Sequence, residues 1–166
     1  MEELPKNTGA RIIKQLLQYK NMTIKELSKL LGYSSAQILT NKLYRDALPL
    51  NEFVHIVNVL GCDVKTVTKD GKNEYIVEYK EKKKEGVKMA GASAIKSILE
   101  AKNIKIKDIA SKLGIKEQVF SNKLYRNTFT LSEYIKIADI LECDVKTISR
   151  DNTITIINKD DSIEAE

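Results

Sequence analysis

The 166-residue sequence predicts a mainly α-helical fold with a small β component, arranged as two four-helix modules that are each followed by a β-hairpin. Three observations lead to this prediction. The chain repeats its own sequence over roughly 60 residues. Hydrophobic residues recur at helical spacing through most of each copy. Each copy then ends in a β-branched, alternating segment that contains a turn signal.

The internal repeat is clearest in two matched segments. Residues 41–45, Asn-Lys-Leu-Tyr-Arg, recur at 122–126, and residues 62–66, Cys-Asp-Val-Lys-Thr, recur at 143–147. The first copy is one residue longer, just after Gly32. A repeat of this length predicts two similar domains. The expected organisation is a first module with its hairpin over residues 1–80, a charged linker over 81–90, a second module with its hairpin over 91–158 and an acidic tail over 159–166.

The first two helices of each copy follow from apolar spacing and end signals. Buried positions of the first helix are expected at Ile12, Ile13, Leu16 and Leu17, and in the second copy at Ile95, Ile98 and Leu99. The second helix begins at Thr23, which forms a capping box with Glu26. Gly32 and Gly114 follow this helix, where a left-handed residue permits a sharp stop.

Two further helices are expected in each copy. The third runs from about residue 35 to 45, and from about 116 to 126. The fourth has apolar residues at helical spacing: Leu50, Phe53, Val54, Val57 and Leu60, and then Leu131, Tyr134, Ile135, Ala138 and Leu141. Thr130 and Glu133 form a second capping box before it.

The periodicity changes after the fourth helix. Residues 62–69 and 74–79 are β-branched or alternating, and residues 69–72, Lys-Asp-Gly-Lys, are a hairpin turn signal. The second copy gives strands over 143–149 and 153–157. A fifth helix through 62–70 is the alternative, although its Val and Thr content counts against it. Because an isolated hairpin is marginally stable, we expect the hairpins to pair or pack, within the chain or between chains.

The segments 27–45 and 109–124 resemble the lambda-repressor-like (Cro/XRE-type) helix-turn-helix family. The matching features are a helix, a turn made of glycine and a hydrophobic residue, a short second helix and apolar residues at the packing positions. The additional residue after Gly32 departs from the usual turn length, which leaves the start of the third helix open in the first copy. The resemblance implies two lambda-repressor-like modules, double-stranded DNA as the partner and a role in transcription.

The third helix presents a polar stripe in each copy. If Leu39 and Leu43 face the core, then Gln37, Asn41 and Tyr44 lie on the opposite face. In the second copy Phe120 and Leu124 face in, while Gln118, Asn122 and Tyr125 point out. Gln and Asn side chains can pair with adenine in the major groove, and basic side chains and helix N-termini can hold phosphates. The residues predicted to contact DNA are Ser35, Gln37, Thr40, Asn41, Lys42, Tyr44 and Arg45, and in the second copy Lys116, Glu117, Gln118, Ser121, Asn122, Lys123, Tyr125 and Arg126.

The two copies differ where the third helix begins. Ser35-Ala36 in the first copy corresponds to Lys116-Glu117 in the second, so related but non-identical half-sites are expected. A twofold arrangement of the modules would place two recognition helices in successive major grooves, about 34 Å apart.

Composition limits the other classes of function. The net charge of +5 suits a polyanion partner, and no nucleotide-binding loop, nucleophile motif or metal-ligand cluster is present. With one histidine and two cysteines, no enzyme activity, cofactor or metal is expected. Cys62 and Cys143 are expected to be small buried side chains, the alternative being a redox-sensing pair if the hairpins meet. No apolar run is long enough for a membrane span, and a cytoplasmic location is expected.

Two hypotheses of function remain. The first is a sequence-specific DNA-binding regulator of bacterial or phage type, a repressor that acts as an intramolecular pseudo-dimer. The second is an antitoxin-like or other protein-interaction module that caps a partner protein and binds DNA secondarily. RNA binding is disfavoured because Tyr44 and Tyr125 are the only aromatic residues on the outward stripe.

Overall fold

The computed structural model of the chain describes residues 8–44, 48–79, 92–126 and 129–158, and the structural statements below concern these ranges. The expected linker 81–90 and acidic tail 159–166 lie outside them. In chain order the elements are α1 (Thr8–Lys20), α2 (Ile24–Leu31), α3 (Ala36–Tyr44), α4 (Leu50–Val59), β1 (Cys62–Thr68), β2 (Glu74–Val77), α5 (Ala92–Lys102), α6 (Ile106–Leu113), α7 (Glu117–Arg126), α8 (Leu131–Ile140), β3 (Cys143–Ser149) and β4 (Thr155–Asn158). The described part of the chain is therefore mainly helical with a small antiparallel sheet, as the sequence predicted.

Both predicted capping boxes are present. At the start of α2, the Glu26 backbone N–H donates to Thr23 Oγ1 at 3.1 Å and the Thr23 N–H donates to the Glu26 carboxylate at 2.9 Å. The same reciprocal pair forms between Thr130 and Glu133 at the start of α8. These bonds satisfy N–H groups that have no partner within the helix, and they set where each helix begins.

The helices pack around one continuous hydrophobic core. The apolar positions predicted for the first and fourth helices of each copy are all buried, with Phe53 fully so and Tyr134 at 1% exposure. The Tyr134 hydroxyl, on α8, forms a hydrogen bond with Thr66 on β1. Because this core includes residues from α1–α4, from α5–α8 and from the sheet, the two halves of the chain share it.

The four strands form one sheet in the order β2-β1-β3-β4. Cys62–Thr68 is a strand, so the alternative of a fifth helix through 62–70 is wrong. β1 and β3 are antiparallel over seven residue pairs, from Cys62 opposite Ser149 to Thr68 opposite Cys143. Lys65 lies opposite Lys146, the residue 81 positions later, at the middle of the ladder. The predicted need of the hairpins for a partner is thus met within the chain.

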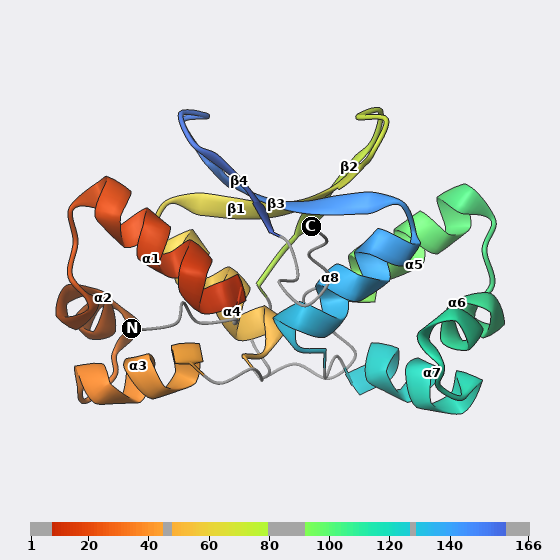
Figure 1. Cartoon of the computed structure of the whole chain (residues 1–166), viewed down its shortest axis with the longest axis horizontal. Helices are drawn as coiled ribbons and strands as arrows, with labels where there is room; N and C mark the ends of the chain where they lie inside the picture. Colours follow the sequence, from red (N-terminus) through yellow and green to blue (C-terminus); the bar gives the residue numbers. More distant parts are fainter. Residues whose placement is uncertain (1–7, 45–47, 80–91, 127–128, 159–166) are drawn as a thin grey trace, which may run out of the picture.

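A second junction joins the halves below the sheet. Pro49 and Thr130, again 81 positions apart, form a β-bridge. The Leu50 N–H donates to the Phe129 carbonyl and the Leu131 N–H donates to the Leu48 carbonyl, both at 3.0 Å. Each edge strand also packs against the opposite half: β2 of the first half lies against α5 of the second, and β4 of the second half lies against α1 of the first (Figure 1). Neither half could therefore keep all of its packing without the other.

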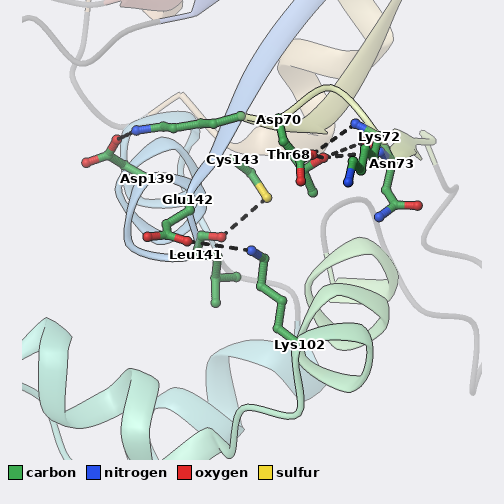
Figure 2. Close-up of polar contacts among 10 residues, drawn as sticks. Thr68, Asp70, Lys72, Asn73, Lys102, Asp139, Leu141, Glu142 and Cys143 are labelled. Atoms are coloured by element: carbon green, nitrogen blue, oxygen red, sulfur yellow. Dashed lines mark hydrogen bonds and ion pairs between the residues drawn. The ribbon is translucent and has the colours of Figure 1, made fainter.

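The buried cysteines do not form a redox pair within the chain. Although the hairpins meet, Cys62 and Cys143 lie at opposite ends of the β1–β3 ladder, six residues apart along a strand. That separation is about 20 Å, whereas a disulfide needs Cα atoms within about 7 Å. Figure 2 shows the Cys143 sulfur, which contacts the Leu141 carbonyl oxygen at 3.6 Å, beside Lys102. Burial raises the pKa of both thiols, which makes them poor nucleophiles.

Each hairpin turn is organised by an aspartate. Asp70 accepts hydrogen bonds from the Thr68 hydroxyl at 2.6 Å and the Lys72 N–H at 3.0 Å (Figure 2). Asp151 accepts equivalent bonds from the Ser149 hydroxyl at 2.7 Å and the Thr153 N–H at 3.1 Å, and also one from the Thr153 hydroxyl. These donors lower the pKa of Asp70 and lower the pKa of Asp151 to about 2.

This pKa shift predicts a specific loss of stability in acid. A carboxylate with a lowered folded-state pKa stabilises the fold above its unfolded pKa of about 3.9, and this contribution disappears as the pH falls through the folded value. We expect Asp151→Asn to lower the melting temperature at pH 5, and the gap from the wild type to close between about pH 4 and pH 2. Thermal unfolding followed by circular dichroism at these pH values measures the gap. A gap that is unchanged at pH 2 would contradict the assignment.

Candidate nucleic-acid interface

The predicted contact residues that the structure describes lie on α3 and α7 or in the turns that precede these helices. α2 ends at Gly32, whose φ is +83°, and the Tyr33 N–H donates to the Ser28 carbonyl at 3.0 Å. α6 ends at Gly114, whose φ is +75°, and the Ile115 N–H donates to Ala110 in the same way. Both turns therefore have the left-handed stop that the glycines predicted.

The additional residue of the first copy is accommodated in the turn. Between Gly32 and α3 lie three residues, whereas two residues separate Gly114 from α7. α3 begins at Ala36 and α7 at Glu117, which are 81 positions apart, so the two helices start in register despite the insertion.

The inward faces of α3 and α7 are as predicted. Leu39 and Leu43 are fully buried, as is Phe120, and Leu124 is 4% exposed. Phe120 also packs against Phe129 with ring centroids 6.1 Å apart. With these positions buried, the opposite faces of both helices point away from the core.

The outward faces carry a matched pair of amides. The Gln37 side-chain N–H donates to Asn41 Oδ1 at 2.9 Å, and the Gln118 N–H donates to Asn122 Oδ1 at 3.2 Å. All four side chains are exposed. Each bond holds the asparagine amide in one orientation, and leaves its NH₂ group and one lone pair of Oδ1 free. Such an amide has the donor and acceptor that adenine N7 and N6 require.

The two lysines predicted to hold phosphates are engaged within the protein. Lys42 Nζ lies 2.9 Å from the Glu52 carboxylate, and Lys123 Nζ lies 3.0 Å from Glu133. In the first half, the Tyr33 hydroxyl also donates to Glu52 at 2.8 Å. Burial and this hydrogen bond raise the pKa of Tyr33. The lysines thus tie each third helix to the fourth, a role that the sequence analysis missed because the glutamates lie on another helix.

The other predicted contact residues divide by exposure. Thr40 and Ser121 lie at the flank of the helix and are partly buried. Tyr125 is 89% exposed, which is unusual for a tyrosine side chain. Ser35, Lys116, Glu117 and Arg126 are exposed as well. Arg45 and the side chain of Tyr44 lie outside the described part of the structure.

Two exposed aliphatic side chains were missed by the sequence analysis. Ile38 is 38% exposed and Val119 is 42% exposed, at matching positions of α3 and α7. The sequence analysis assigned neither side chain to the core or to the surface, because their exposure depends on what the neighbouring helices leave uncovered.

α3 and α7 lie on one side of the molecule. Figure 1 shows them at opposite ends of the edge that faces away from the sheet. α3 and α7 thus lie on the same side of the molecule, away from the β1–β3 junction.

Comparison with known proteins finds a similarity over part of the chain. Residues 94–153 match the family model of the Cro/C1-type HTH DNA-binding domain. No curated protein and no solved structure matches the chain. The Cro/C1-type domain extends from α5 to the turn after β3, and it contains α7 with all of the contact residues predicted for the second copy. It supports a DNA-binding regulator.

The described ranges contain neither a metal-ligand cluster nor a membrane-spanning helix. No group of three or more His, Cys, Asp or Glu side chains is placed to hold a metal ion there. None of the helices described has both the length and the apolar character that crossing a bilayer requires.

Proposed function

We propose that the chain is a sequence-specific regulator of transcription that binds double-stranded DNA through two helix-turn-helix modules, as an intramolecular pseudo-dimer. The first module comprises α1–α4 and the second α5–α8, and the paired hairpins join them. Repression by blocking a promoter is the mode that the resemblance to lambda-repressor-like proteins implies. The proposal assigns no catalytic role to the chain.

The reciprocal β1–β3 junction is the observation that carries the proposal. Lys65 faces Lys146 and Pro49 faces Thr130, so equivalent positions meet both in the β1–β3 ladder and at the Pro49–Thr130 bridge. A twofold relation of this kind matches the symmetry of a palindromic operator, which homodimeric repressors read with two identical subunits. Here one chain would present both reading helices, and the covalent link would raise the effective concentration of the second module.

The half-sites are expected to differ. Lys116 precedes α7 and Glu117 opens it, whereas Ser35 precedes α3 and Ala36 opens it. Because Ser35, Lys116 and Glu117 are exposed at the start of the reading helix and Ala36 is half-buried there, the operator should be an imperfect inverted repeat.

Selection of bound sequences from a pool of random duplexes tests the proposal. We expect enrichment of a motif with two related halves whose centres are separated by about one helical turn of DNA, about 34 Å. Enrichment of no motif would contradict the proposal and favour the protein-interaction module. A single unpaired half-site would contradict the pseudo-dimer alone.

Arg126 is expected to act on affinity without affecting sequence preference. Its side chain is exposed at the C-terminal end of α7, where a guanidinium can reach the phosphate backbone. We expect Arg126→Ala to weaken binding to all duplexes by a similar factor and to reduce the slope of log K against log salt by about one. Titrations of the selected and a scrambled duplex at several salt concentrations measure both. Lys72→Ala, which also removes an exposed cation but from the turn between β1 and β2, on the side away from α7 (Figure 1), is the charge control.

A further inference from the structure

Ile38 and Val119 are exposed although their neighbours on the same helices are either buried or polar. Their exposed fractions are 38% and 42%. β-branched residues have a lower helix propensity than alanine or the polar residues that usually occupy exposed helix positions. An exposed β-branched apolar residue in a helix therefore occurs at equivalent positions of the two modules.

Both side chains belong to the outward surface that carries the amide pairs. Residues three apart on a helix are separated by about 60° around its axis, so Ile38 lies beside Asn41 and Val119 beside Asn122. Adjacent residues differ by about 100°, which leaves Gln37 and Gln118 on the other side of each asparagine. Each module thus presents one glutamine, one asparagine and one aliphatic side chain side by side.

The major groove offers one kind of apolar group to such a side chain. Among the four bases, thymine alone carries a methyl group on the major-groove edge, at C5. The neighbouring asparagine has the donor and acceptor that adenine requires, and each adenine in a duplex is paired with a thymine. An aliphatic side chain beside an adenine-reading amide is therefore placed where thymine methyl groups occur.

We propose that Ile38 and Val119 are specificity-determining residues that read thymine methyl groups, so that each half-site contains A·T base pairs next to each other. This inference rests on the proposed function and adds the base composition that the two modules select. In the free protein this apolar area is exposed to water. Contact with a methyl group would bury it, and this burial favours binding. Isoleucine reaches one carbon further than valine, so the contact in the first half is the larger one.

Replacement of single thymines by deoxyuridine in the selected duplex tests the inference, because this change deletes the C5 methyl group and leaves base pairing intact. For the wild type we expect about a fourfold loss of affinity at one thymine in each half-site, which corresponds to about 0.8 kcal/mol for one methyl group. Ile38→Ala should abolish the loss in one half-site only, and Val119→Ala in the other only.

Ile76→Ala is the matched control. Ile76 is another aliphatic side chain, 55% exposed, but it lies on β2, in the sheet on the side away from α3 and α7 (Figure 1). This variant should keep the full sensitivity to deoxyuridine. Circular dichroism melts establish that all three variants are folded. In Ile38→Ala and Val119→Ala, the helix propensity of alanine favours this.

The outcomes separate the two proposals. An enriched two-part motif whose affinity does not change with deoxyuridine, or changes equally in Ile38→Ala, Val119→Ala and the wild type, overturns the methyl contact and leaves the proposed function standing. Enrichment of no motif overturns the proposed function and the methyl contact with it.

Discussion

Replacing Asn122 by alanine is expected to reduce discrimination between A·T and the other base pairs at one operator position by about 5- to 150-fold. The range follows from the 1–3 kcal/mol that a good bidentate contact to a base contributes. The Gln118 amide already donates to Asn122 Oδ1, so the asparagine is held in one orientation before DNA is bound. A preoriented side chain loses little rotamer freedom on binding, which places the expected effect in the upper part of the range.

Competition binding with duplexes that carry each of the four base pairs at that position measures the change. Asn41→Ala is the matched control, because it removes the equivalent side chain from α3, where Gln37 donates to it at 2.9 Å. It should relax the preference in the other half-site and leave the first untouched. A uniform loss of affinity for all sequences in Asn122→Ala would mean that the side chain holds the backbone of DNA and does not read a base.

The local signals in the sequence were sufficient for most of the elements. Helix starts at Thr23 and Thr130 were predicted correctly because a capping box is made by residues three apart. The stops at Gly32 and Gly114 depend only on the left-handed backbone that glycine adopts readily. The inward residues of α3 follow from a period of 3.6, which a single helix fixes without knowledge of its neighbours.

Contacts between segments that are distant in the sequence could not be predicted from these local signals. The sequence predicted that the hairpins need a partner, but pairing within a chain and between chains uses the same strand edges. The ion pair between Lys123 and Glu133 depends on how α7 crosses α8, and neither residue marks the other in the sequence. For the same reason Ile38 was assigned to no surface, since its exposure depends on what the neighbouring helices leave uncovered.

Inserting about five base pairs between the half-sites of the selected duplex is expected to weaken binding by about 10²- to 10⁴-fold. Five base pairs are about half a helical turn, so the insertion moves one half-site to the opposite face of the duplex. The protein would then bind with one module only and lose the gain that comes from linking the two. Affinity measured against duplexes with insertions of increasing length gives the result directly.

An insertion of about ten base pairs distinguishes a rigid pair of modules from two modules on a flexible tether. It returns the half-site to the same face but moves it about 34 Å along the duplex. The β1–β3 ladder of seven residue pairs, the reciprocal bonds of Leu50 and Leu131 and the shared core all resist separation of α3 from α7. We therefore expect the ten-base-pair insertion to weaken binding as much as the five-base-pair insertion does. Recovery of affinity at ten base pairs would mean that the halves come apart on DNA, because one module can follow a displaced half-site only by breaking the sheet.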